Sequence, residues 1–204
     1  MVYLIGGAPR VGKSIIARRL AQETGADLIS TDDLWSESVK ELTESERKEK
    51  YPFPGFSGTA SENTLTSDEL TRLQLIEAAS LWPELDEVIR KAIAIDEPLV
   101  IEGVHLIPEY VDRLIAEFGP RRIRAVFVGS RDVADVAEGI AKNTSSDNWM
   151  KDANPEVISQ LAAFVAAFSA HIKTEAERNR LKYEERTKDF EGDIKTILSM
   201  VLGE

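Results

Sequence analysis

The stretch Gly7-Ala-Pro-Arg-Val-Gly-Lys-Ser14 decides the fold of this chain, because it fills every fixed position of the pattern G-x-x-x-x-G-K-[ST]. The two glycines let the backbone turn sharply and approach phosphate oxygens without a Cβ atom in the way. The lysine reaches the β- and γ-phosphates of a nucleotide, and the hydroxyl group that follows it can bind Mg²⁺. The spacing therefore predicts a site for a nucleoside triphosphate.

The residues on either side of this loop provide the setting that the pattern requires. Val2–Ile5 is a short apolar run typical of a buried strand, and Gly12–Glu23 has the spacing of an amphipathic helix. Backbone amides in the loop then face the bound anion, and the positive end of the helix dipole adds to their effect. We expect the nucleotide to be bound by Gly7, Ala8, Pro9, Arg10, Val11, Gly12, Lys13, Ser14 and Ile15.

Strands and helices alternate along the rest of the chain, which predicts an α/β fold with right-handed crossovers. The further predicted strands are Asp27–Ser30, Leu99–Glu102, Ile123–Val128 and Leu181–Glu184. The further predicted helices run from Thr66 to about Leu81, Pro83 to about Ile95, Pro108 to Phe118, Arg131 to Lys142, Pro155 to about Arg180 and Asp189 to Leu202. Glu41–Lys50 is so charged that it forms either a solvated helix face or a loop.

Two stretches, 36–83 and 130–154, are longer than ordinary connections, and long connections in compact domains are commonly functional. Within the second stretch, Asn143–Ala153 is expected to be a polar loop. The first of them and its border carry a group of aromatic residues that form either a slot facing the substrate or a small core of their own. These residues are Trp35, Tyr51, Phe53, Phe56 and Trp82.

Composition narrows the class of protein. The 204 residues include 25 lysines and arginines against 36 aspartates and glutamates, for a net charge of −11, which disfavours binding to nucleic acid or to anionic lipid. The chain has no cysteine and only two histidines, so disulfides, thiol nucleophiles and multi-histidine metal centres are not expected. With no signal-peptide pattern and no apolar run longer than Leu161–Phe168, we expect one cytoplasmic domain; the oligomeric state stays open.

Asp32 follows the second predicted strand, in Ser30-Thr-Asp-Asp-Leu34. Loops at the carboxyl ends of parallel strands converge on the ligand, so a carboxylate there can accept a proton from a substrate hydroxyl or hold a metal ion or its waters. The structural alternative is that Thr31 or Asp32 only caps the next helix. The two interpretations are compatible.

Glu102 ends the third predicted strand, in Leu99-Val-Ile-Glu-Gly103. A carboxylate on an apolar strand is costly to bury without a cation or hydrogen bonds, and Glu102 can hold the waters around Mg²⁺. The candidate metal site is therefore Ser14, Asp32 and Glu102, with a solvated carboxylate at a sheet edge as the alternative for Glu102. Gly103 leaves room for a substrate, and the nearby His105 either lines the site or is structural.

At these motifs the chain resembles the P-loop kinases of small molecules, a group that includes adenylate, shikimate and gluconate kinases, chloramphenicol phosphotransferase and the zeta toxins. The local similarity is greatest to 2-phosphoglycerate kinase, at Ile5–Ala8 with Gly12–Ser14, at Ser30–Asp32 and at Ile101–Pro108. The resemblance implies a P-loop NTPase fold in three α/β/α layers, with a five-stranded parallel sheet. It also implies a substrate-binding insertion at about 36–83 and a lid at about 130–154.

The resemblance further implies ATP and Mg²⁺ as cofactors, a small-molecule substrate, and Asp32 as base or substrate anchor. Lys13 and Arg10 are the candidate catalytic cations. The sequence departs from the group in the lid, where an arginine commonly neutralises the transferring phosphoryl group. Between Asp132 and Asn154 it has Lys142 and Lys151 but no arginine.

The sequence thus predicts an ATP-dependent phosphotransferase that acts on a small hydroxyl-bearing metabolite. The absence of an N-K-x-D motif argues against a GTPase, and a strand ending in Glu102-Gly103 instead of Asp-Glu argues against a ring-forming motor. Two alternatives stay open. One is a nucleotide-dependent switch or partner-binding ATPase, and the other is a toxin-like kinase of nucleotide sugars.

Overall fold

Five parallel strands form one sheet in the order β2-β3-β1-β4-β5. The computed structural model describes the chain except for residues 54, 57–63, 143–152 and 204. The strands are β1 (Val2–Gly7), β2 (Asp27–Ser30), β3 (Leu99–Gly103), β4 (Ile123–Gly129) and β5 (Lys182–Glu185). The helices are α1 (Lys13–Thr24), α2 (Thr31–Ser38), α3 (Glu44–Lys50), α4 (Ser67–Ala94), α5 (Pro108–Phe118), α6 (Val133–Lys142), α7 (Pro155–Arg178) and α8 (Phe190–Leu202).

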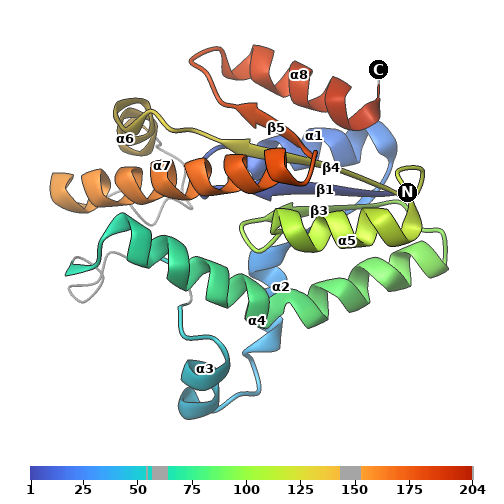
Figure 1. Ribbon diagram of the computed structural model, residues 1–204, viewed down its shortest axis with the longest axis horizontal. Coiled ribbons are helices and arrows are strands. Elements are labelled where there is room, and N and C mark those ends of the chain that lie inside the picture. The colour runs from blue at the N-terminus through green and yellow to red at the C-terminus, as the bar shows by residue number, and fades with distance from the viewer. Residues whose placement is uncertain (54, 57–63, 143–152, 204) are drawn as a thin grey trace.

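Helices cover both faces of this sheet (Figure 1). Helices α1 and α8 pack together on one face, whereas α4, α5 and α7 pack on the other. Burial on both faces explains why the central strand β1 is a continuous apolar run, with Val2, Leu4 and Ile5 fully buried. The predicted three-layer α/β/α fold with a five-stranded parallel sheet is confirmed.

The parallel register brings the carboxyl ends of the strands to one edge. Gly6 of β1 pairs with Gly103 of β3, Ser30 of β2 pairs with Glu102 of β3, and Gly7 pairs with Val128 of β4. The loops that leave β1, β2 and β3 therefore begin side by side. This edge is where ligands bind in open α/β sheets.

One long helix, α4, replaces the two helices predicted on either side of Pro83. Proline removes one backbone hydrogen bond and crowds the preceding turn, which is why the sequence indicated a break. The apolar face nevertheless continues through Leu81 and Leu85, both fully buried, so packing holds the helix together across the proline. Figure 1 shows that α4 bends near its middle instead of ending there.

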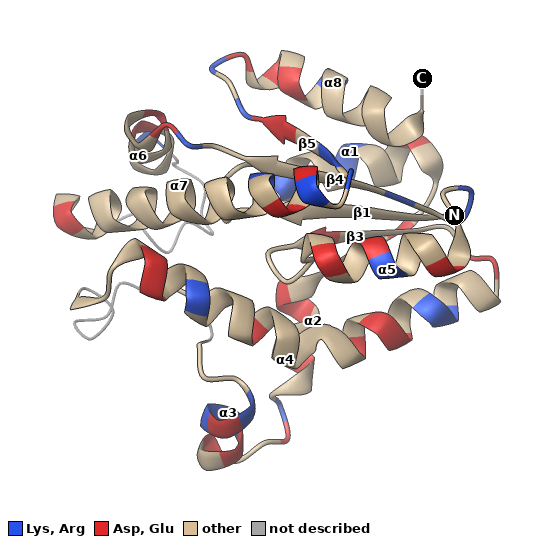
Figure 2. Cartoon of the chain, viewed as in Figure 1, with Lys and Arg blue, Asp and Glu red and all other residues tan. Residues whose placement is uncertain are grey.

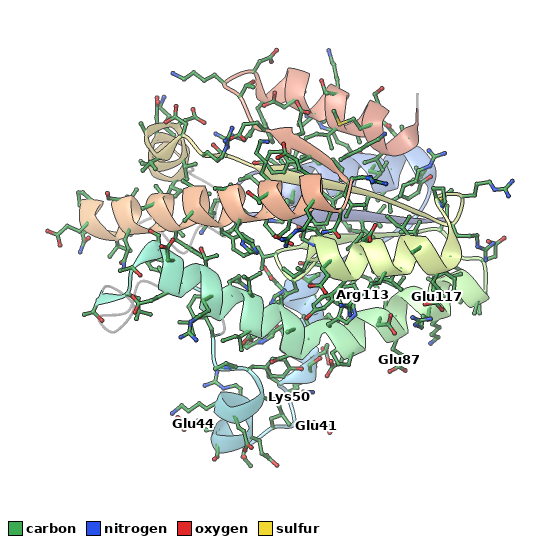
Figure 3. All side chains as sticks on the ribbon, viewed as in Figure 1. Glu41, Glu44, Lys50, Glu87, Arg113 and Glu117 are labelled. Atoms are coloured by element: carbon green, nitrogen blue, oxygen red, sulfur yellow. The ribbon has the colours of Figure 1, made fainter. Side chains whose placement is uncertain are left out.

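The charged segment before this helix forms α3, in which no residue is buried. A capping box at Thr43 and Glu46 starts the helix, and Figure 2 shows basic and acidic residues alternating around it. Lys50 at its end pairs with Glu84 of α4 at 2.6 Å. Figure 3 labels Lys50 beside α3. Of the two alternatives for this segment, the solvated helix is correct.

The aromatic residues that follow α3 are buried rather than open to solvent. Phe53 and Phe56 lie 6.5 and 6.4 Å from the ring of Phe164 in α7, and Tyr51 packs edge-on against Trp35 at 6.2 Å. This packing favours a core over the open slot, and that core is continuous with the main core of the domain rather than separate from it.

Helix α7 is long and apolar enough to cross a membrane by length and composition alone. Its residues Leu161, Ala162, Phe164, Val165 and Phe168 are buried, and the helix packs against α4, α6 and β4. It is therefore a core helix of this fold, as the helical spacing of these residues predicted. The polar loop expected before it lies mostly outside the described residues.

Candidate nucleotide-binding and phosphoryl-transfer site

The loop between β1 and α1 has the backbone geometry that its sequence pattern predicted. Gly7, Arg10 and Gly12 have positive φ angles of 127°, 62° and 89°. The N–H group of Ala8 donates to the carbonyl oxygen of Val128 at 3.1 Å, and a Cβ atom on Gly7 would lie only 1.9 Å from that oxygen. Glycine is thus required here because β4 approaches closely, in addition to any requirement of a ligand.

The second fixed glycine of the pattern also has a packing role. A Cβ atom on Gly12 would lie 2.5 Å from the ring of Phe190, at the start of α8. The guanidinium group of Arg186 lies 5.9 Å from the centre of the same ring. The loop therefore packs against Phe190 at the start of α8.

Lys13 lies at the centre of the site with only 6% of its surface exposed. Its Nζ atom donates to the carbonyl oxygen of Ala8 at 2.6 Å. Burial lowers the pKa of Lys13, and the negative charges of Glu102 and Asp32 act in the opposite direction. A buried ammonium group held by a neutral carbonyl is poised to receive an anion such as a phosphate group.

Ser14 and Glu102, two residues of the candidate metal site, lie in contact. The Oγ atom of Ser14 donates to Oε1 of Glu102 at 3.0 Å. Glu102 is only 6% exposed, because β3 is an inner strand. The alternative of a solvated carboxylate at a sheet edge is therefore wrong, whereas hydroxyl and carboxylate oxygens are the ligands that Mg²⁺ prefers.

The Asp32 carboxylate lies at the start of α2, and its side chain is 78% exposed. The side chain of Ser30, rather than that of Thr31 or Asp32, caps the helix by accepting the N–H of Asp32 at 3.3 Å. The capping alternative for Asp32 is therefore wrong, and its carboxylate is accessible to a substrate hydroxyl.

His105 is buried beside Asp32, with 5% of its surface exposed. Its Nδ1 atom lies 2.8 Å from Oγ1 of Thr31 and 3.9 Å from Oδ1 of Asp32. Burial, together with the positive charge of Lys13, lowers the pKa of His105 to about 4. The imidazole is therefore neutral at pH 7, so its contact with Asp32 is not an ion pair, and its hydrogen bond to Thr31 favours the structural role.

The space beside Gly103 holds the side chain of Thr31 and not open room for a substrate. A Cβ atom on Gly103, whose φ angle is 154°, would lie 1.7 Å from Oγ1 of Thr31. We expect Gly103→Ala to displace Thr31 and lower the free energy of unfolding by about 2 kcal/mol or more. The control is Gly119→Ala, where φ is 83° but no atom lies within 4 Å of the added Cβ. Urea denaturation that gives equal losses for both variants would contradict this account.

Three arginines lie in the loops that follow β1, β4 and β5, and one of them, Arg131, is the first residue of the helix predicted in the lid. Arg10 lies in the loop itself, and burial lowers the pKa of its guanidinium group. Arg131 binds Glu185 through its backbone N–H at 2.7 Å and its Nε atom at 2.8 Å. Arg186 binds Asp135 of α6 at 2.9 Å. The position of Arg186 was not predicted, because the sequence does not show that β5 delivers it to this edge.

Glu77 of α4 is a buried carboxylate that sequence analysis missed. It is 0% exposed; its Oε1 accepts from Nε1 of Trp35 at 2.5 Å, and its Oε2 accepts from the N–H of Phe53 at 3.0 Å. It thereby ties α2, the helix that carries Asp32, to the insertion. The sequence did contain a signal for it, because an acidic residue at position 77 interrupts the apolar face of a predicted helix.

Burial raises the pKa of Glu77 from 4.5 to about 7, although the Phe53 and Trp35 hydrogen bonds oppose the rise. The folded state therefore holds its proton more tightly than the unfolded chain, so stability is lost as the pH rises. Relative to Glu77→Gln, we expect the free energy of unfolding of the native chain to fall by about 1–3 kcal/mol between pH 4.5 and 7.5. Urea denaturation across this range checks it, and parallel pH profiles for the two proteins would contradict it.

Three features of this edge together define the class of protein. They are a loop with the phosphate-binding pattern after the central strand, a buried lysine, and carboxylates that follow two neighbouring strands. The chain has the fold of the P-loop kinases, and the resemblance noted in the sequence is confirmed at the level of the fold.

Comparisons with known proteins agree with this class. No family model matches the sequence. The chain is similar to mevalonate-3-phosphate 5-kinase of Thermoplasma acidophilum, with 27% identity over 117 residues, which are 56% of this chain and 55% of that protein. The matched region thus spans about half the length of this curated relative.

Solved structures of kinases share the fold over nearly the whole chain. A gluconokinase from Sinorhizobium meliloti 1021 has a TM-score of 0.55 at 17% identity, covering 100% of this chain and 91% of its own. A sugar kinase from Janibacter sp. HTCC2649 has a TM-score of 0.56 at 15% identity, covering 98% and 92%. A shikimate kinase from Bacteroides thetaiotaomicron has a TM-score of 0.53 at 12% identity, covering 100% and 99%.

Proposed function

We propose that this chain is an ATP-dependent phosphotransferase that acts on a small hydroxyl-bearing molecule. The observation that carries the proposal is the meeting of Lys13, the Ser14–Glu102 pair and the accessible Asp32 at one edge of the sheet. The likeness to a curated kinase and to solved kinase structures supports the same activity.

In this proposal the loop from Gly7 to Ile15 binds the phosphates of ATP through its backbone amides. Lys13 binds the β- and γ-phosphate oxygens, and Arg10 adds a second positive charge to the loop. Phosphoryl transfer needs positioning and charge neutralisation more than covalent help from the protein, so a rigid cationic loop is the main requirement. Ser14 and Glu102, which are in contact, would hold Mg²⁺, which neutralises phosphate charge when bound, and Asp32 is then left for the acceptor.

Asp32 orients the acceptor hydroxyl and takes its proton. The acceptor oxygen forms a bond to the γ-phosphorus while the bond from that phosphorus to the bridging oxygen breaks, and ADP leaves. The exposure of the Asp32 carboxylate supports this role, because a substrate can reach it without rearrangement of α2.

The two long connections have proposed roles in the same reaction. Residues 36–83 would bind the acceptor, and residues 130–154 would close over ATP and exclude water. The lack of an arginine between Asp132 and Asn154 favours one competing function, a nucleotide-dependent switch.

One assay separates the two functions. ATP consumption is measured alone, with a panel of hydroxyl-bearing metabolites, and with a cell extract freed of small molecules. Stimulation by a single small molecule, with ADP and a phosphorylated product in equal amounts, is the expected result. Stimulation only by the protein fraction would favour the switch and contradict the kinase.

A further inference from the structure

The buried face of α4 carries polar residues where an apolar core is expected. Thr71, Gln74 and Glu77 follow one another at the spacing of a helical turn and are 9%, 3% and 0% exposed. The same face includes the fully buried Leu70 and Ala78. Polar side chains among such neighbours need hydrogen-bond partners, because burial removes them from water.

Two of these three residues are without such partners among the described residues. The Oγ1 atom of Thr71 and the Nε2 atom of Gln74 are buried and make no hydrogen bond there, whereas Glu77 has both oxygens paired. A buried donor without a partner is costly, and most proteins avoid it. An unpaired Thr–Gln pair on one helix face is therefore best explained by a ligand that completes its hydrogen bonds.

The pair lies on the side of the fold where an acceptor must bind. The first half of α4 and the first half of α7 extend past the carboxyl ends of the strands (Figure 1). One turn further along α4, Glu77 contacts Trp35 of α2, and Asp32 lies in the first turn of α2. The polar face thus begins beside the helix of the proposed base and continues toward the N-terminus of α4.

The surroundings of this face are aromatic. Phe53 is linked to Glu77 through its N–H, and the rings of Phe53 and Phe56 pack against Phe164. Because these rings belong to the core, the groups on this face that a small molecule could contact are its polar ones, which in binding sites are few and fix orientation. Among the buried residues that the structure describes, Lys13 is the only cation, so Thr71 and Gln74 offer neutral hydrogen-bonding groups with no buried cation beside them on α4.

We propose that Thr71 and Gln74 form the part of the acceptor site that binds uncharged hydroxyl groups. This inference rests on the proposed kinase function and assigns its substrate class, a polyol or sugar whose far end is neutral. Gln74 donates through Nε2 to a hydroxyl oxygen, and Thr71 exchanges a hydrogen bond with a neighbouring hydroxyl.

The test uses the full chain and the variants Thr71→Val and Gln74→Met, which keep about the size of each side chain and remove the unpaired groups. Ser80→Ala is the matched control, because Ser80 is an exposed hydroxyl residue of the same helix, bonded to the carbonyl of Ile76. Glycerol, erythritol, xylitol and D-glucose are titrated by calorimetry into protein loaded with a non-hydrolysable ATP analogue. Thermal unfolding of each ligand-free protein is measured in parallel.

We expect at least one of these probes to bind the native chain, and its Kd to rise at least about tenfold in each variant. The Tm of the ligand-free variants should stay equal or rise, because an unpaired polar group has been removed. Ser80→Ala should change neither quantity. Binding of the ATP analogue should be the same in all four proteins.

Three results would overturn the inference. These are no binding of any uncharged probe to the nucleotide-loaded native chain, equal affinity in the two variants, and a fall in Tm in both ligand-free variants. The last would mean that water already pairs with the two groups. A polyol that binds in this titration is then assayed with ATP in place of the analogue. If it causes no ADP formation, the kinase function is contradicted, whereas the binding site on α4 is not.

Discussion

Replacement of Lys13 by methionine is expected to lower ATP turnover by about 10²–10³-fold or more and to weaken ATP binding. Methionine keeps the length of the buried side chain but loses the charge that faces the phosphates. Because the ammonium group is buried beside a neutral carbonyl, its removal should leave the fold intact. Turnover is measured as ADP formation, binding by calorimetry and folding by thermal unfolding.

The matched control is Lys40→Met, which removes an exposed lysine that pairs with Glu37 at the end of α2. Its turnover and Tm should equal those of the native chain, because exposed ion pairs contribute little. If the Lys13 variant kept more than about a tenth of native turnover, the loop would not be the phosphate-binding element.

Asp32→Asn is expected to leave ATP binding unchanged and to lower acceptor-dependent ADP formation by about 10²–10⁴-fold, the usual range for loss of a general base. The amide keeps the size of the side chain but cannot take a proton. Since Ser30 caps α2, the substitution should not disturb the helix. Unchanged transfer would exclude Asp32 as base and leave it, at most, as a substrate anchor.

Asp33→Asn provides the control for this result. Asp33 is the next residue in the first turn of α2 and would change the charge near the helix N-terminus to the same extent. We expect its turnover to stay within about threefold of the native value. An equal loss in both variants would mean that the effect comes from the helix terminus rather than from a base at position 32.

The sequence predicted most of the sheet and the phosphate-binding loop, because both depend on local signals. The strands β1, β3 and β4 are short, largely apolar runs, and the loop has fixed glycines that β4 and Phe190 require. The carboxylates at positions 32 and 102 could be predicted as well, since parallel strands deliver their ends to one edge. The roles of these residues in catalysis stay predictions until variants are measured.

What the sequence could not show depends on contacts between distant segments. Glu77 meets Trp35 across 42 residues, and only the folded chain shows that both oxygens of this carboxylate are paired. Pro83 led to the wrong prediction of a helix boundary. Proline commonly ends a helix, but here the packing of α4 against the rest of the fold keeps the helix continuous. The lack of hydrogen-bond partners for Oγ1 of Thr71 and Nε2 of Gln74 among the described residues is likewise a property of the fold, because the sequence does not show which groups surround them.

The continuity of α4 determines how this protein can be recombined with its relatives. Because one helix begins in the proposed acceptor region and ends against the sheet, cutting at Pro83 would sever the helix and expose Leu81 and Leu85. The predicted insertion at 36–83 therefore cannot be exchanged alone without cutting α4. To change the acceptor preference, the whole segment between Ser38 and Leu99 should be replaced by the corresponding segment of a related kinase. The chimera then contains an uninterrupted α4 from one protein.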